Sequence, residues 1–436
     1  MSQEYGFDTK KVRAGYEPKD HKYAVSPPIY QTAAYDFRDV ENAAALFGLR
    51  EAGFLYTRVG NPTVAVLEER VKALDGASGA IALSSGMAAV SYTLLNLAEG
   101  GGRILTSPYL YGGSADSFKK IYPKFGISFD WARNLFDPDK LAEEIKPDTK
   151  AIYIESVSNP NTFLLDIDAI AEAAHKHGIP LVVDNTVATP YLYNPIAHGA
   201  DIVIYSATKG LNGHGNLIAG LVLEAGRFNW KTEKFAHFDE KYYTLRDAEG
   251  NLRSFLDVFP ENPFTARLRF NFLNYFGAAL GPFDAYLAII GLETLSERLA
   301  KQVGNAESLA EYLKNHERVE WVRYPKLAEG RQGELFRRDF PRGAGGVLAF
   351  GFKGTREERE KFLNSVRLFH YHVNIGDSKS LIVNSPQTTH GELEPREKEA
   401  ADIPENLIRI SAGLEDSADL IADLEQAFRA AGLGLY

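Results

Sequence analysis

The chain has 436 residues, of which 45% are hydrophobic and 24% charged, and this balance is typical of a folded globular protein. Its length predicts two or three domains. The formal net charge of −10 disfavours nucleic acid as a partner, and the absence of cysteine excludes disulfides, thiolate zinc sites and a cysteine nucleophile. These properties favour an enzyme that acts on small molecules.

Location and metal content are also predicted from what the sequence lacks. No apolar run approaches the roughly 18 to 20 residues needed to span a bilayer, and the N-terminus has no apolar signal-peptide core. We therefore expect a cytoplasmic protein with no membrane partner. The histidine pairs His175/His177 and His370/His372 are too sparse to form a metal site, so we expect no metal.

The first part of the chain, residues 1–63, is rich in Pro, Tyr and Gly and shows no clear periodicity. Such a segment cannot form a hydrophobic core of its own. We expect an N-terminal arm that packs on another part of the protein or on a neighbouring subunit.

From residue 64 to about residue 280, short apolar runs alternate with amphipathic stretches. The amphipathic stretches include residues 64–76, 86–100 and 167–178. The strand candidates are residues 80–84, 103–107, 127–131, 151–155, 179–184, 201–206 and 217–223. This alternation predicts a large α/β domain over residues 64–280, with a mostly parallel seven-stranded sheet covered by helices on both faces.

The rest of the chain follows another pattern. Residues 225–265 are polar, aromatic and aperiodic, which indicates an insertion in the large domain. Residues 283–316 predict a long helix with a kink near Gly291. The strand candidates 346–352 and 407–413, with a final helical pattern, predict a smaller α+β domain over residues 281–436.

Polar residues follow the predicted parallel strands of the large domain, at the edge where α/β proteins bind ligands. They are Ser84, Ser85, Glu155, Asp184, Thr186, Ser206, Thr208 and Lys209. In "SSGMAA" (84–89) a strand passes straight into a helix, whose free N–H groups suit a phosphate. This signal is weak alone, because serine and glycine begin many helices.

Asp184 and Lys209 each have a structural and a chemical interpretation. Asp184 can cap the next segment, or it can pair with a cationic ring nitrogen. In a P-loop the glycines precede the lysine and a hydroxyl residue follows it. In "SATKGLNGHG" the glycines follow Lys209, so this segment is not a P-loop. Most lysines are solvated surface groups, but burial at a strand end lowers the pKa of a lysine and makes it a nucleophile. A phosphate cradle, an aspartate and a lysine together indicate a pyridoxal phosphate pocket.

Ten segments of the chain resemble the Cys/Met-metabolism family of pyridoxal-phosphate enzymes, which have the fold-type I architecture. The resemblance covers nearly the whole chain and predicts pyridoxal 5'-phosphate as the cofactor. The segments, in the family's order, are "PPIYQTAAYDF", "YTRVGNPT", "SSGMAA", "YLYGGS", "ESVSNP", "VVDNT", "YSATKGLNGHGN", "GLETL", "KSLIVNSPQTTH" and "IRISAGLED".

The resemblance implies roles for individual residues. Lys209 would form the Schiff base with the cofactor and move the substrate's protons, and Tyr111 would stack on the ring and take part in proton transfer. Asp184 would pair with the ring nitrogen, with Asn159 near the ring's phenolic oxygen. Arg409 would grip the substrate carboxylate, with Ser380 beside it. The other residues expected to bind the cofactor, mainly its phosphate, are Ser85, Gly86, Met87, Thr186, Ser206 and Thr208.

The resemblance also predicts an oligomer. Tyr56 and Arg58 match a pair that reaches the phosphate, and Tyr56 also the substrate, in a neighbouring subunit. We therefore expect a homotetramer built from two catalytic dimers, with the N-terminal arm packed on its partner. His214 is expected to make a structural hydrogen bond.

Within the family, the chain length, the aromatic insertion and "GAGGVLAFGF" (343–352) look most like the O-acetylhomoserine sulfhydrylases. The expected reaction joins O-acetylhomoserine to sulfide or methanethiol and releases acetate. Met87, Gln302 and Glu392 depart from the usual pattern, which leaves the acyl group and thiol open. The alternatives are a cystathionine γ-synthase or γ-lyase, or a catalytically silent binding protein. A NAD-binding domain is disfavoured because no GxGxxG follows the early strands.

Overall fold

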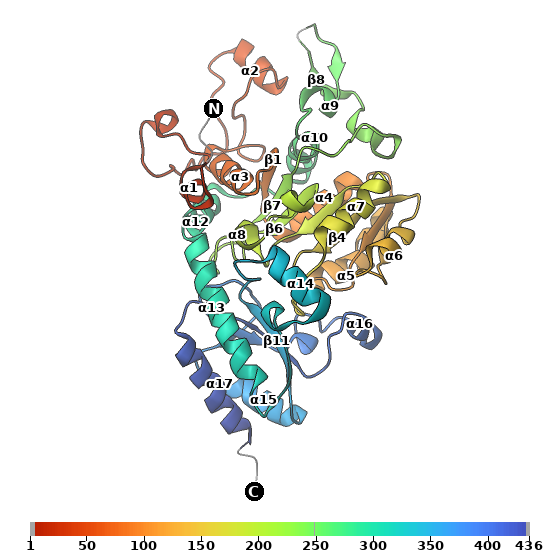
Figure 1. Cartoon of the computed structure of the whole chain (residues 1–436). Helices are drawn as coiled ribbons and strands as arrows, with labels where there is room; N and C mark the ends of the chain where they lie inside the picture. The colour runs from red at the N-terminus through yellow and green to blue at the C-terminus, as the bar shows by residue number, and fades with distance from the viewer. Residues whose placement is uncertain (1–4, 248, 433–436) are drawn as a thin grey trace.

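The computed structural model describes residues 5–247 and 249–432, and it shows two main sheets (Figure 1). The larger sheet has seven strands in the spatial order β1-β7-β6-β5-β4-β2-β3. In chain order they are β1 (Gly79–Leu83), β2 (Gly102–Thr106), β3 (Ile127–Trp131), β4 (Thr149–Glu155), β5 (Leu181–Asp184), β6 (Ile202–Ser206) and β7 (Gly220–Glu224). Within the described residues, no helix is both long and apolar enough to cross a membrane.

The large sheet is parallel except at one strand. β7 runs antiparallel to both of its neighbours, β1 and β6, and all the other pairs are parallel. Alternate side chains enter two different cores, as Leu221 and Val222 of β7 do. The helices around the sheet are α3 (Pro62–Asp75), α4 (Gly86–Leu97), α5 (Gly112–Lys120), α6 (Pro138–Glu143), α7 (Ile167–Lys176), α8 (Thr189–Leu192), α10 (Pro263–Arg267) and α12 (Pro282–Glu293). This confirms the expected mostly parallel seven-stranded sheet with a core on each face.

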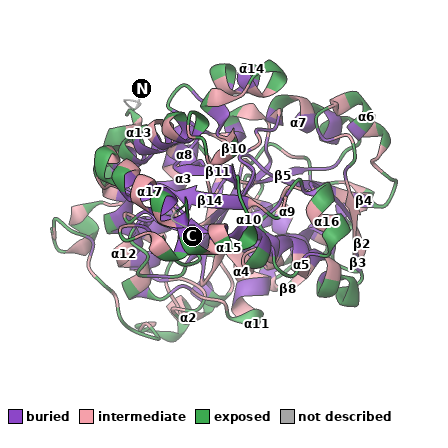
Figure 2. Ribbon diagram, turned by 90° about the horizontal axis from the view of Figure 1, so that it is seen from below, coloured by how far each residue is buried: buried purple, intermediate pink, exposed green. Residues whose placement is uncertain are grey.

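The smaller sheet has five strands in the order β10-β11-β14-β13-β12. They are β10 (Val319–Arg323), β11 (Val347–Phe352), β12 (His370–Tyr371), β13 (Leu381–Val383) and β14 (Leu407–Ser411). The helices in this part of the chain are α13 (Leu295–Lys314), α14 (Gly330–Asp339), α15 (Arg356–Ser365), α16 (Pro395–Ala400) and α17 (Ser417–Gly432). α13 runs along one side of the molecule from the large layer to this one (Figure 1). Buried residues gather on the strands, whereas α14 and α16 show many exposed residues (Figure 2).

The predicted helix over 283–316 is two helices, α12 and α13, which meet at Thr294, three residues after Gly291, near which a kink was expected. Thr294 has φ −116° and ψ 20°, which ends the regular helix. Gly291 has another role, because a Cβ atom there would lie 2.3 Å from the carbonyl oxygen of Asn212. The glycine therefore lets α12 approach the loop after Lys209 closely.

The N-terminal segment and the insertion both project from the large layer (Figure 1). α1 (Phe7–Arg13) packs on α3 and α12 of its own chain, and Lys11 is buried there against Ser296 and Glu297. Farther along the arm, the side chains of Tyr23 and Val25 are 78% and 89% exposed. The helix α2 (Val40–Phe47) follows them. The insertion contains the hairpin β8 (Tyr242–Arg246) and β9 (Leu252–Arg253), followed by α9 (Phe255–Val258). α11 (Asn274–Phe276) precedes α12.

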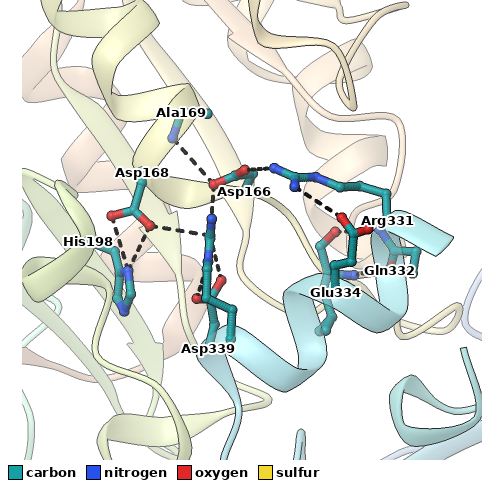
Figure 3. Close-up of polar contacts among 10 residues, drawn as sticks. Asp166, Asp168, Ala169, His198, Arg331, Gln332, Glu334 and Asp339 are labelled. Atoms are coloured by element: carbon teal, nitrogen blue, oxygen red, sulfur yellow. Dashed lines mark hydrogen bonds and ion pairs between the residues drawn. The ribbon is translucent and has the colours of Figure 1, made fainter. Parts of the chain in front are cut away.

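Ion pairs join α14 to the large layer (Figure 3). The Arg338 guanidinium lies 2.9 Å from Asp166 and 3.3 Å from Asp168, and it also contacts its neighbour Asp339. Asp168, Asp339 and His198 are close enough together to hold a metal ion. Because the guanidinium already neutralises these carboxylates, we interpret the cluster as a structural contact.

The phenylalanine cluster of the smaller layer gives a stability prediction. Phe428 of α17 is 3% exposed and stacks on Phe362 of α15, with ring centroids 4.4 Å apart. Phe428→Ala leaves a cavity, and we expect the free energy of unfolding to fall by about 3 to 5 kcal/mol. Urea denaturation followed by circular dichroism measures the change. Phe125→Ala is the control because Phe125 is 65% exposed, and equal midpoints for the two variants would contradict the prediction.

Candidate active site

A cavity opens at the carboxyl ends of the parallel strands of the large sheet. Eleven of the predicted site residues line it: Ser85, Gly86, Met87, Tyr111, Asn159, Asp184, Thr186, Ser206, Thr208, Lys209 and Arg409. They come from segments that lie far apart in the sequence, and Arg409 comes from the smaller sheet. The strand ends and the smaller layer thus enclose one polar site.

The beginning of α4 forms one wall of the cavity. Ser85 caps this helix, and its hydroxyl accepts a hydrogen bond from the N–H of Ala88 at 3.0 Å. A Cβ atom on Gly86 would lie 2.7 Å from the Cβ of Ser206, so only glycine lets the helix start approach β6. The N–H groups of the first turn therefore stand beside the Ser206 and Thr208 hydroxyls, an arrangement that suits a phosphate.

Two carboxyl groups lie side by side at the strand ends. Asp184 of β5 pairs in register with Glu155 of β4, and both line the cavity. Asp184 accepts hydrogen bonds from the N–H of Thr186 at 3.0 Å and the phenol of Tyr153 at 3.4 Å. Burial raises the pKa of Asp184, since the charged form loses hydration. A buried carboxylate here gains from a cationic partner such as a protonated ring nitrogen.

Lys209 lies just beyond β6, with its amine inside the cavity. The Nζ atom donates a hydrogen bond to Oδ1 of Asn374 at 2.9 Å. Burial and, to a smaller extent, the positive charge of Arg409 lower the pKa of Lys209 to about 8, although the negative charge of Asp377 opposes the shift. At pH 7 about 10% of such an amine is neutral, against about 0.03% for an ordinary lysine. The amine is thus prepared for nucleophilic attack.

Arg409 is the second cation of the cavity and is only 1% exposed. Nη1 donates to Oδ1 of Asn159 at 3.1 Å, and Nη2 donates to the carbonyl of Asn374 at 2.9 Å. The Nε atom is buried and has no partner among the described residues. Because a buried guanidinium without an anion is costly, this arrangement fits the binding of a substrate carboxylate.

Three predicted residues lie outside the cavity. Ser380 is fully buried, and its hydroxyl donates to Glu415 at 2.8 Å and accepts from the N–H of Gly413, so its side chain holds a turn of the smaller layer. Tyr56 and Arg58 lie on the N-terminal arm, where the guanidinium stacks 5.1 Å from the phenol ring. Tyr56 is 44% exposed.

His214 contacts its own loop, with Nδ1 2.6 Å from the carbonyl of Asn212.

Asn374 and a group of apolar residues also line the cavity, and the sequence patterns did not predict any of them. The apolar wall consists of Val90, Val157, Val187, Ile218, Val373 and Ile375. Asn374 follows β12, a strand of two residues without a clear pattern, so no local signal marks it.

A lysine with a lowered pKa, a strand-end aspartate and a helix start beside two hydroxyls define a pyridoxal-phosphate enzyme of the α/β class. The family model for Cys/Met metabolism PLP-dependent enzymes matches residues 8–429. The chain belongs to this family, and its cofactor is therefore pyridoxal phosphate.

The chain is similar along its length to several characterised proteins. It is 39% identical to an O-acetyl-L-homoserine sulfhydrylase of Leptospira meyeri and 40% identical to a homocysteine synthase of Schizosaccharomyces pombe, with 98% of each chain covered. A crystal structure from Campylobacter jejuni, provisionally named an O-acetylhomoserine (thiol)-lyase, has a TM-score of 0.92 and 36% identity and covers 98% of this chain and 100% of its own. That protein carries a pyridoxyl-lysine monophosphate at its position 205.

The lowered pKa of Lys209 predicts a pH dependence of cofactor attachment. Only the neutral amine attacks the cofactor's aldehyde, so the attachment rate of the apoprotein should rise about tenfold per pH unit and level off near pH 8. Stopped-flow absorbance after mixing apoprotein with pyridoxal phosphate measures this rate.

Asp377→Asn tests the electrostatic origin of this profile. The negative charge of Asp377 raises the pKa of Lys209, so its removal should move the midpoint to lower pH. A midpoint near 10.5 in the unaltered protein, the ordinary value for lysine, would contradict the assignment.

Proposed function

We propose that the protein catalyses γ-replacement on O-acetyl-L-homoserine. Sulfide or methanethiol takes the place of acetate, and the products are homocysteine or methionine. The observation that carries the proposal is the placement of Lys209 and Arg409 across one cavity. The names of relatives at 36% to 40% identity over nearly the whole chain support it.

Five residues of the cavity have a direct part in this reaction. Bound pyridoxal phosphate supplies an electron-withdrawing ring that stabilises negative charge on the substrate. Asp184 would keep the ring nitrogen protonated, and Tyr111 would cover the ring. Arg409 would hold the substrate carboxylate, and Asn159 orients the guanidinium through their hydrogen bond. Lys209 would take a proton from the α-carbon and pass it to the bound cofactor, which frees the amine to take a proton from the β-carbon. Acetate would then leave from the γ-carbon, the thiol would add there with loss of its proton, and the two protons would return to the β-carbon and the α-carbon.

The names of the relatives support an acetyl group as the leaving acyl group. The proteins from Leptospira meyeri and Corynebacterium glutamicum, at 39% and 36% identity, are both named O-acetyl-L-homoserine sulfhydrylases. Among the described residues of the cavity lining, the cations are Lys209 and Arg409, and both already have a role in the proposed reaction.

We further propose that the active form is a cytoplasmic homotetramer of two catalytic dimers. Tyr56 and Arg58 lie outside the cavity of their own chain, and they would reach the cofactor phosphate of a neighbouring subunit. Exposed apolar residues on the same arm, Tyr23 and Val25, fit a surface that packs on a partner. Light scattering on the active enzyme tests this, and a fully active monomer would contradict it.

Product analysis distinguishes the replacement from its rivals. We expect the purified protein with O-acetylhomoserine and sulfide to release acetate and form homocysteine, as the names of its relatives indicate. Ammonia and a 2-oxo acid as main products from methionine or cystathionine would instead indicate a γ-lyase, and they would contradict the proposal. Lys209→Ala is the control, since it should lose both the products and the visible absorbance of the bound cofactor.

Substitution of Arg409 tests the carboxylate clamp. Arg409→Lys keeps the charge but loses the fork of N–H donors, so we expect KM for the amino-acid substrate to rise about 10-fold to 100-fold. Cofactor affinity should stay nearly the same. Steady-state kinetics and a cofactor titration measure the two effects. Arg342→Lys is a matched control because Arg342 is exposed and does not line the cavity; an equal rise in KM there would contradict the assignment.

A further inference from the structure

Glu155 is a buried acid of the cavity to which the proposed reaction gives no role. It is 5% exposed and ends β4, next to Asp184 at the end of β5. Both side chains line the cavity, so they leave the same face of the sheet. No lysine or arginine forms an ion pair with Glu155 in the part of the chain that the structure describes.

The partners of Glu155 are backbone N–H groups that belong to two site residues. Oε1 accepts a hydrogen bond from the N–H of Tyr111 at 2.6 Å. The N–H of Asn159 is close enough to the carboxyl group to stabilise its charged form and oppose the rise of its pKa. Tyr111 precedes α5, where no side chain caps the helix start. Asn159 contacts the guanidinium of Arg409. One buried carboxyl group thus holds the backbone of the ring-covering residue and of the residue that orients the clamp.

We propose that Glu155 is a positioning residue which holds Tyr111 and Asn159 as a neutral carboxylic acid, so that Asp184 alone is negative beside the ring nitrogen. Two adjacent buried carboxylates repel each other, and one proton between them removes that repulsion. Both groups accept hydrogen bonds, but Asp184 is the one expected to meet the positive charge of the ring nitrogen, so Asp184 would keep the negative charge. A protonated carboxyl group still accepts both N–H groups through its carbonyl oxygen.

The surroundings of Glu155 agree with the neutral form. Burial and the negative charge of Asp184 raise the pKa of Glu155 well above its ordinary value. The other titratable groups that line the cavity are Lys209, Arg409 and Tyr111, and Tyr153 lies on the same strand. Among the described residues, neither Lys209 nor Arg409 forms an ion pair with Glu155, and the two tyrosines carry no positive charge. The inference rests on the cofactor site and holds for any acyl group and any thiol.

Two substitutions separate positioning from charge. Glu155→Gln is neutral and keeps the carbonyl acceptor, so cofactor affinity should stay within about threefold of the unaltered protein. Glu155→Ala removes the acceptor that holds the N–H of Tyr111 and no longer contacts the N–H of Asn159, and affinity should fall about 10-fold to 100-fold. Fluorescence titration of the apoprotein with pyridoxal phosphate measures both effects. Glu224 is a matched control, since it is 1% exposed and accepts from the N–H groups of Phe264 and Thr265 away from the cavity.

Spectroscopy tests the protonation state directly. An infrared difference spectrum of the holoenzyme against Glu155→Gln should contain the C=O stretch of a protonated carboxylic acid, shifted in D2O. The pH profile of the cofactor's visible absorbance should be the same in both proteins. A profile moved by one pH unit or more, or a carboxylate band in place of the acid band, would show that Glu155 is charged and overturn the proposal.

The role in positioning can fail separately. Unchanged cofactor affinity in a folded Glu155→Ala protein would overturn it, as would an equal loss of affinity in Glu224→Ala. If Glu155→Ala does not fold, the affinity and infrared spectrum of Glu155→Gln decide the question. These measurements use no acyl donor or thiol, so their outcome is independent of the product analysis.

Discussion

The register of three parallel strands is the constraint on which the site depends. β4, β5 and β6 pair so that Glu155 lies beside Asp184, and Asp184 lies beside Ile204 just before the turn to Lys209. Because side chains alternate between the two faces of a sheet, a slip of one residue would carry Asp184 away from the cavity. The apolar residues before it, Val182 and Val183, enter opposite cores and so fix this register.

The antiparallel strand β7 shapes the part of the cavity where we expect the cofactor's phosphate. It lies between β1 and β6, and Gly220 at its first position pairs with Leu83 and Ser206. A Cβ atom on Gly220 would lie 2.1 Å from the carbonyl oxygen of Ser85. The missing side chain lets the turn from β1 to α4 approach β7 closely, and Gly86 lets the same turn approach Ser206 of β6. The helix start and the Ser206 hydroxyl are therefore brought together by close backbone packing, and burial of the strands maintains it.

Local sequence patterns predict the strand ends of the large layer but not the contacts between segments that lie far apart in the sequence. Asp184 directly follows an apolar run and Lys209 comes three residues after the end of another, so their place at the sheet edge could be predicted from periodicity. A kink was expected near Gly291, and the helix breaks three residues later at Thr294. The close approach of Gly291 to Asn212 has no signal in a local pattern. Asn374 meets Lys209 across a separation of 165 residues, which no motif spacing specifies.

Burial of an acid alone does not identify a functional group in this fold. Asp75 is buried, and desolvation raises its pKa to about 7, but its carboxylate accepts from the phenol of Tyr205 at 2.8 Å within the core. Glu224 has a similar pKa and joins β7 to α10 through Phe264 and Thr265. Glu155 differs because the N–H groups it accepts belong to residues that line a cavity. A buried acid thus belongs to the functional site when its hydrogen-bond partners line the cavity. Tyr111 and Asn159, beside Glu155, line the same cavity as Lys209 and Arg409.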